Sequence, residues 1–193
     1  MTVLVDYGAG NMTSVRNAFA ALGEDTMVTR DPAVVAAADR VVFPGVGAAG
    51  SAMANLRAAG LVESVQTAAL SGKPFLGICL GMQILFSHSE EDGGVECLDV
   101  FGGRVRRFPS YGGFKIPEMG WNTVEGLHDG SAPEFYFVHS YYAEIVPETA
   151  GVTEYANVRF TAMARRGRLW ACQFHPEKSG RIGLELLKEW LAC

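Results

Sequence analysis

The chain has 193 residues, of which 49% are hydrophobic and 19% are charged, and its formal net charge is −5. This composition excludes an intrinsically disordered chain, and the acidic balance argues against a general nucleic-acid binder, which needs a basic face. No apolar run approaches the roughly 18 residues of a membrane span. The length predicts one domain over residues 1–193.

The first half of the sequence alternates short apolar runs with helical patterns. Val15, Phe19 and Leu22 recur on one helical face, and the run from Pro74 to Ile78 is as apolar as a buried parallel strand. The sequence predicts strands at residues 3–5, 27–29, 40–43 and 74–78, and helices at 11–22, from 31, from 51 with a break at 60, and at 80–86.

Strand-like segments dominate the second half, with candidates at residues 104–108, 134–138, 141–145 and 169–174. A closing helix is predicted from Gly180 to Leu191, with Ile182, Leu186, Leu187 and Trp190 on its apolar side. This order predicts an α/β fold, in which helices flank a largely parallel central sheet and the second half adds a β-rich section.

The cysteines and the N-terminus bear on localisation. Four cysteines are scattered along the sequence without a Cys-x-x-Cys pair, which is typical of reduced thiols in a cytosolic protein. The first residues, Met1 to Asp6, have neither the basic start nor the long apolar stretch of a signal peptide. We therefore expect a cytoplasmic protein.

The pentapeptide Gly77-Ile78-Cys79-Leu80-Gly81 stands where a buried strand passes into a predicted helix. This is the pattern of a nucleophile elbow, with cysteine in the place of serine. The glycines leave room for a sharp, strained turn, and a helix N-terminus favours the thiolate of Cys79. The backbone N–H of Leu80 would point into the same space as an oxyanion donor. A buried structural cysteine is the alternative interpretation.

A thiolate that attacks an acyl group needs a base that later protonates the leaving amine. His175 follows an apolar strand, and Glu177 lies two residues further on, close enough to orient the imidazole. Alone, His175-Pro176-Glu177 is also typical of a surface turn, but with Cys79 it predicts a Cys-His-Glu triad. Zinc deaminases share the His-x-Glu pattern, but their Pro-Cys-x-x-Cys segment is missing, so we expect no metal.

The loop Pro44-Gly45-Val46-Gly47 follows the third predicted strand. Its glycines allow backbone N–H groups to approach a ligand, so the loop is either a second oxyanion donor or an ordinary turn between strand and helix. The phosphate-binding pattern Gly-x-x-x-x-Gly-Lys-Ser/Thr does not occur, and no nucleotide cofactor is expected.

The glycine loop, Gly-x-Cys-x-Gly and His-Pro-Glu, in this order, resemble the class I (triad) glutamine amidotransferases over essentially the whole chain. The resemblance implies a glutaminase that needs no cofactor. Cys79 would attack the side-chain amide of glutamine, His175 would carry the proton, and Glu177 would orient His175. Ammonia would leave, and water would hydrolyse the glutamyl thioester. The implied oxyanion donors are backbone N–H groups at Val46, Gly47 and Leu80.

Further segments resemble the glutaminase subunits of imidazole glycerol phosphate synthases, which act in histidine biosynthesis. These segments are Val5 to Asn11, Pro44 to Gly47, Met119 to Asn122 and His175 to Ser179. The resemblance implies a heterodimer with a cyclase subunit, which is a (β/α)8 barrel that takes ammonia through its interior. The residues that match the partner interface are Asn11, Trp121, Asn122, Tyr136 and Lys178.

The same resemblance implies where glutamine binds. The matching residues are Gly45, Gly47, Gln83, Glu91, His139, Ser140 and Tyr141. Gln83 follows Cys79 by about one helical turn, and Glu91 suits the substrate's ammonium group. Without the resemblance, Gln83 would be read as an exposed helix residue and Glu91 as part of a solvated charge run. One position departs from the pattern: the family commonly has Pro-His-Met-Gly-Trp-Asn, whereas Glu118 replaces that histidine here.

We expect a glutaminase that is slow alone and faster when its cyclase partner carries substrate. Rotation of peptide groups in the loop at residues 44–47 is the candidate switch, because a missing oxyanion donor costs about 10²–10³ in rate. Three other functions remain open. They are a glutaminase with a different acceptor, a cysteine hydrolase or peptidase on a similar sheet, and a binding protein without catalysis.

Overall fold

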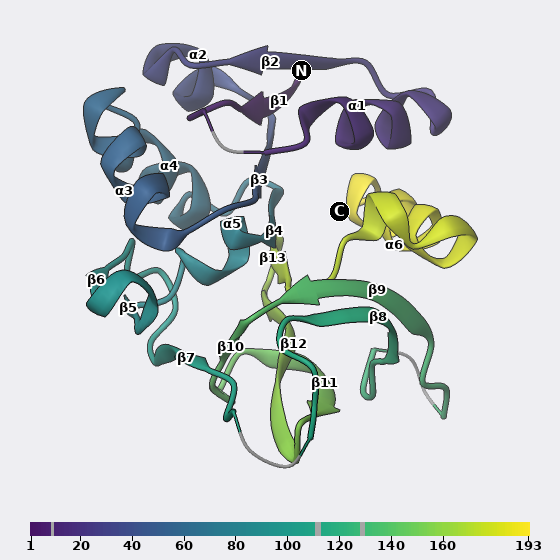
Figure 1. The fold of residues 1–193 in the computed structure, drawn as a ribbon. Coiled ribbons are helices and arrows are strands. Elements are labelled where there is room, and N and C mark those ends of the chain that lie inside the picture. Colours follow the sequence, from purple (N-terminus) through teal and green to yellow (C-terminus); the bar gives the residue numbers. More distant parts are fainter. Residues whose placement is uncertain (9, 111–112, 128–129) are drawn as a thin grey trace.

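Strands and helices alternate in the first half of the chain, and strands predominate in the second (Figure 1). The computed structural model describes residues 1–8, 10–110, 113–127 and 130–193. Its strands are β1 (Thr2–Val5), β2 (Thr26–Thr29), β3 (Arg40–Gly45), β4 (Phe75–Cys79), β5 (His88–Ser89), β6 (Val95–Glu96), β7 (Arg104–Arg107), β8 (Glu118–Thr123), β9 (Glu134–His139), β10 (Tyr141–Ala143), β11 (Thr149–Tyr155), β12 (Val158–Arg166) and β13 (Leu169–Cys172). Its α-helices are α1 (Met12–Ala21), α2 (Pro32–Ala37), α3 (Ala49–Ala58), α4 (Val62–Leu70), α5 (Leu80–Gln83) and α6 (Gly180–Leu191), and its 3₁₀ turns are η1 (Glu91–Gly93) and η2 (Pro176–Lys178).

A sheet of eleven strands organises these elements in the order β2-β1-β3-β4-β13-β12-β10-β7-β5-β6, with β11 paired to β12. The first five strands of this order are parallel, and the rest form a mixed extension. β8 and β9 make a separate antiparallel pair. The predicted α/β fold with a large central sheet and flanking helices is thus confirmed. None of the described helices combines the length and the apolar character that a membrane span requires.

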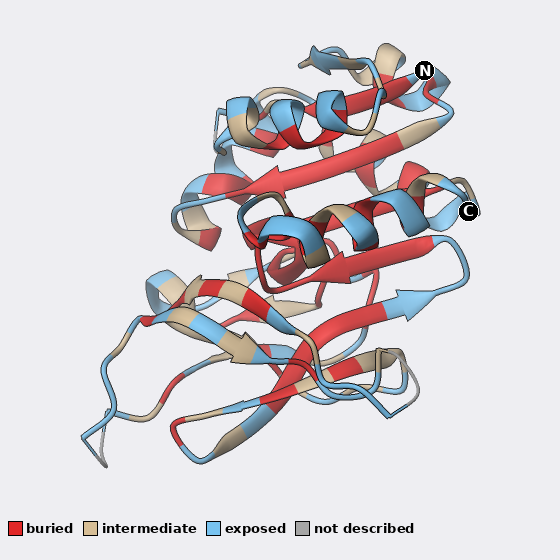
Figure 2. Cartoon of the chain, turned by 90° about the vertical axis from the view of Figure 1, so that its right-hand side faces the viewer, coloured by how far each residue is buried: buried red, intermediate tan, exposed pale blue. Residues whose placement is uncertain are grey.

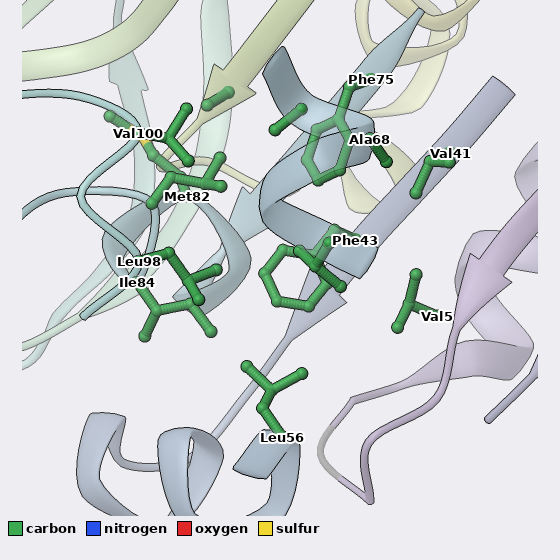
Figure 3. Close-up of a cluster of buried hydrophobic side chains, with 14 of the residues drawn as sticks. Val5, Val41, Phe43, Leu56, Ala68, Phe75, Met82, Ile84, Leu98 and Val100 are labelled. Carbon is green, nitrogen blue, oxygen red and sulfur yellow. The ribbon is translucent and has the colours of Figure 1, made fainter. Parts of the chain in front are cut away.

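The central strands are buried on both faces, because helices cover each side of the sheet. Along β3, Val41 and Phe43 pack into a cluster with α2, α3 and α4, while Val42 enters a second cluster with α1 and α6. Figure 3 shows the first cluster, where the rings of Phe43 and Phe75 lie 6.0 Å apart. Figure 2 shows the result, with buried residues along the central strands and exposed residues on the outer helix faces.

The prediction that the third strand ends at residue 43 is wrong, because β3 continues to Gly45. Its neighbour β4 continues with it, and Pro44 pairs with Ile78 and Gly45 with Cys79. The pairing with β1 has stopped at Val42, so Pro44 lies where β3 is open on one side and a missing N–H is tolerated. The strand therefore carries the glycine loop up to the level of Cys79.

Two helices also differ from the prediction. The helix expected at 80–86 is the single turn α5, because the N–H groups of Leu85 and Phe86 bond three residues back and tighten the chain into turns. The helix expected from residue 51 starts at Ala49, whose N–H is capped by a side chain 42 residues away. Strands β5, β6, β8, β11 and β12 were not predicted, since their polar and apolar residues do not form continuous runs.

Glycine at position 81 lets α5 lie directly against β3. A Cβ at this position would be 1.9 Å from the carbonyl oxygen of Phe43, and a Cβ at Gly77 would be 2.9 Å from Leu85. A Cβ at Gly45 would in turn be 2.9 Å from the backbone nitrogen of Gly81. No side chain fits between these backbones, so the elbow at Cys79 depends on glycine on each side.

We therefore expect Gly81→Ala to lower the free energy of unfolding by about 3 kcal/mol, because the backbone of β3 or α5 must move. Urea denaturation of the purified variant measures this change. Gly102→Ala is the matched control, since a Cβ there meets no atom within 4 Å. Equal stability of the two variants would contradict the close contact.

Candidate active site

Cys79 ends β4 in a backbone conformation that L-residues rarely adopt, with φ 55° and ψ −111°. Such strain persists only where the surroundings enforce it, and it gathers at functional sites. The residue is 7% exposed and opens into a cavity. This is the geometry predicted for a nucleophile elbow. Because α5 has only four residues, its helix dipole is weak. The stabilisation of the thiolate predicted for a helix N-terminus is therefore limited to the free N–H groups of one turn.

His175 and Glu177 follow β13, the parallel neighbour of β4. Nδ1 of His175 lies 2.8 Å from Oε1 of Glu177, and both side chains are almost fully buried. Because a carboxylate only accepts, Nδ1 carries the proton in this hydrogen bond. The other ring nitrogen, Nε2, has no nitrogen or oxygen partner among the described residues, and His175 lines the same cavity as Cys79.

The charge state of His175 reflects this arrangement. Burial disfavours the charged ring, but interactions with Cys79 and with the Glu177 carboxylate outweigh burial and raise the pKa of His175 to about 10. A histidine with such a pKa is an imidazolium at neutral pH. It is then a proton donor beside a cysteine, which suits acyl transfer from an amide.

The cavity at this point of the sheet has a volume of about 380 Å³. It brings together all the predicted oxyanion and glutamine-binding residues except Gly45, which is buried at the end of β3. Glu177 lies behind His175 and does not line the cavity. Within the described ranges, no three His, Cys, Asp or Glu side chains are grouped closely enough to hold a metal ion. The residues that line the cavity are Val46, Gly47, Cys79, Leu80, Gln83, Glu91, Pro117, Val138, His139, Ser140, Tyr141 and His175.

Gln83 is buried, with 5% of its surface exposed, and so is not the exposed helix residue that its sequence context also allowed. Its Nε2 donates to the carbonyl oxygen of Tyr141 at 2.8 Å and to Oε1 of Gln173 at 2.9 Å. Nε2 of Gln173 in turn lies 3.7 Å from Sγ of Cys79. Sequence reasoning missed Gln173, although an amide in an apolar strand end two residues before His175 was the available signal.

Glu91 and Asp92 belong to η1 but cap the distant helix α3. Oε2 of Glu91 accepts the N–H of Ala49 at 2.7 Å, and Oδ2 of Asp92 accepts the N–H of Gly50 at 3.1 Å. Burial raises the pKa of the Glu91 carboxyl, although the hydrogen bond from Ala49 opposes this shift. Glu91 is thus half-buried at the cavity wall and does not belong to a solvated charge run.

The predicted oxyanion donors come from two elements. Val46 and Gly47 are exposed at the cavity wall, and Gly47 has φ 98°, which favours glycine. Leu80 is the first residue of α5, directly after Cys79. Both backbone segments line the same cavity as Cys79.

The predicted interface residues lie outside the cavity. Trp121 is 55% exposed, and its ring lies 6.3 Å from that of Tyr136 on the neighbouring strand. The N–H of His175 donates to the carbonyl of Tyr136 at 2.9 Å, so β9 joins this surface to the cavity. Lys178 is exposed in η2, Asn11 caps α1 through Ser14, and Asn122 bonds to Glu118 and to the carbonyl of Glu154.

Comparison with known proteins identifies the family. The model of the class-I glutamine amidotransferases matches residues 3–192. The chain belongs to the class-I glutamine amidotransferase family. Among curated relatives of this amidotransferase, the "Imidazole glycerol phosphate synthase subunit HisH" of Methanothermobacter thermautotrophicus is 47% identical, with 99% of this chain and 98% of the relative covered. The protein of the same name from Moorella thermoacetica is 48% identical, with 97% and 92% covered.

Solved structures show the same amidotransferase fold. A structure described as a glutamine amidotransferase superposes with a TM-score of 0.76 at 18% identity, and the match covers 98% of this chain and 97% of the other. A glutamine amidotransferase from Thermotoga maritima gives a TM-score of 0.61 at 18% identity, with 99% and 83% covered.

The raised pKa of His175 predicts a pH-dependent stability. A ring with a pKa of about 10 in the folded state and 6.5 in the unfolded state stabilises the fold fully below pH 6.5 and loses this contribution as the pH rises through about 10. The free energy of unfolding of the wild type should therefore fall more steeply over this range than that of His175→Gln. Urea denaturation across the range measures both slopes, and parallel slopes would contradict the shift.

Proposed function

We propose that this amidotransferase is the glutaminase subunit of an imidazole glycerol phosphate synthase. It would hydrolyse L-glutamine to glutamate and ammonia and pass the ammonia to a cyclase subunit for histidine biosynthesis. The observation that carries the proposal is the meeting of Cys79 and the His175–Glu177 pair in one cavity, in a chain whose 47–48% identical relatives carry this subunit's name.

In the proposed reaction, the thiolate of Cys79 attacks the side-chain amide carbon of glutamine. The backbone N–H groups of Val46, Gly47 and Leu80 stabilise the oxyanion, since they border the cavity beside the thiol. The imidazolium of His175 gives its proton to the leaving nitrogen as the C–N bond breaks. His175 then takes a proton from water, which attacks the thioester and releases glutamate, while Glu177 keeps the ring oriented.

The proposed glutamine contacts are limited by bonds that already exist in the cavity. The carbonyl of Tyr141 accepts from both Gln83 and His139, so its two lone pairs are used. The stretch from His139 to Tyr141 would therefore hold glutamine through its N–H groups and the side chain of Ser140. One oxygen of Glu91 caps α3, and its second oxygen is the one we assign to the substrate's ammonium group.

The outer face of β8 and β9 is the proposed contact with the cyclase, a (β/α)8 barrel. Met119 and Trp121 are 64% and 55% exposed there, and large exposed apolar side chains of this kind are typical of protein interfaces. Asn11, Tyr136 and Lys178 complete the proposed surface, whereas the side chain of Asn122, also expected there, bonds to Glu118 on the opposite face of β8. Since Tyr136 contacts His175 through the backbone, the partner would sit next to the site where ammonia is released. We expect the complex in the cytoplasm, where the chain's free thiols persist.

Replacing the nucleophile separates the two proposed activities. We expect Cys79→Ala in the complex to abolish synthesis with glutamine and to leave synthesis with an added ammonium salt near the wild-type rate, because the cyclase performs that step. Ammonia release and product formation measure the two activities. Loss of both activities in a folded complex would contradict the proposed division of labour.

Truncating the exposed indole tests the partner surface. Trp121→Ala should raise the Kd for the cyclase by about tenfold or more, as loss of an aromatic anchor does at other interfaces. Leu70→Ala on α4 is the matched control, because Leu70 is 61% exposed on a different element. Titration calorimetry measures both, and equal affinity of the two variants would exclude Trp121 from the interface.

A further inference from the structure

Glu118 is a buried carboxylate that does not line the cavity. It starts β8 and pairs in register with His139, the last residue of β9. Oε2 of Glu118 lies 3.0 Å from Nε2 of His139, and the two side chains are 4% and 2% exposed. A carboxylate in this position needs a specific partner, because an unpaired buried charge is strongly destabilising.

The imidazole of His139 is held in place from more than one side. Nδ1 lies 2.7 Å from the carbonyl oxygen of Tyr141, and since a carbonyl only accepts, Nδ1 carries a proton. Nε2 of His139 and Oε2 of Glu118 are therefore neighbours, but neither atom has a hydrogen-bond partner among the described residues. The rings of Phe108, Phe137 and Phe160 surround the imidazole, with centroids 5.3, 5.6 and 5.4 Å from it.

On the cavity side, a series of contacts connects His139 to the nucleophile. The carbonyl of Tyr141 that receives His139 also receives Nε2 of Gln83 at 2.8 Å. The same Nε2 bonds to Gln173, whose amide lies 3.7 Å from Sγ of Cys79. His139 is therefore connected to the thiol through the Tyr141 carbonyl and the two glutamine side chains.

On the surface side, a hydrogen bond connects Glu118 to Asn122, four residues further along β8. Oε1 of Glu118 accepts from Nδ2 of Asn122 at 2.8 Å, and the same Nδ2 donates to the carbonyl of Glu154 at 3.1 Å. Asn122 lies next to the exposed Trp121. The side chain of Glu118 thus contacts both Asn122 of β8 and His139 of β9.

We propose that Glu118 is a positioning residue for glutamine binding, which holds His139 and, through the Tyr141 carbonyl, Gln83 in the arrangement that receives the substrate. This inference rests on the proposed glutaminase function. Glu118 touches neither the thiol nor the substrate, so it acts on affinity for glutamine and not on the chemical step.

Two substitutions test this role. In Glu118→Gln, an amide of the same size stays beside Nε2 of His139, and its oxygen still accepts from Asn122. In Glu118→Leu, a side chain of similar volume removes the carboxylate beside Nε2 of His139 and one of the two acceptors of Asn122 Nδ2. We expect Glu118→Leu to raise the KM for glutamine about tenfold with little change in kcat, and Glu118→Gln to stay within about twofold of the wild type.

Glutaminase kinetics would be measured in the complex with the cyclase, in the presence of the cyclase's nucleotide ligand. Glu125→Ala is the matched control, since Glu125 forms an exposed ion pair with Arg159 outside this chain of contacts. Should Glu118→Leu fail to fold, Asn122→Ala breaks the outer link and should raise KM in the same direction by a smaller factor.

A raised KM in Glu118→Leu that Glu118→Gln rescues supports the inference. Wild-type KM in the leucine variant, a loss confined to kcat, or an equal defect in the glutamine variant overturns it. If the wild-type complex released no ammonia from glutamine, this result would contradict both the proposed function and the inference.

Discussion

The backbones of β3 and of the turn after β4 lie closer together than any side chain allows, and the active-site geometry depends on this contact. The carbonyl of Phe43 occupies the position that a Cβ at residue 81 would need. The contact forces the chain to reverse at Cys79, which produces the strained backbone there. It also sets Gly45 level with Cys79, so the glycine loop emerges beside the thiol. Nucleophile and oxyanion loop are therefore positioned by one packing constraint.

A second feature of the site is that its polar side chains bind one another before any substrate arrives. Gln83 and Gln173 use their amide groups to join β10, β13 and the thiol of Cys79. Buried polar groups of this kind are costly unless paired, so each bond fixes its neighbours. The cavity is preorganised as a result, and little reordering is needed to bind a small amide.

The sequence predicted the local features well and the contacts between distant segments poorly. The elbow at Cys79 and the pairing of His175 with Glu177 were predicted because the residues of each lie within a few positions of each other, although His175 and Glu177 pointed to catalysis only together with Cys79. The start of α3 at Ala49 depends on Glu91, 42 residues away, and no N-cap side chain in the neighbouring sequence marks this start. The same limit applies to β8: its buried residue, Glu118, is charged, and its exposed ones include Trp121, so the usual pattern is reversed.

The caps on α3 have a consequence for the glycine loop. On one side the loop is anchored by Gly45, which pairs with β4, and on the other by the carboxylates of η1 that hold Ala49 and Gly50. Only the short span from Val46 to Ala48 lies between these anchors. A span of this length cannot swing as a flap, so its freedom is restricted to turning individual peptide planes in place. Glu91, which anchors the loop through Ala49, also lines the cavity. A ligand that binds Glu91 would therefore act directly on the residue that fixes one end of the loop.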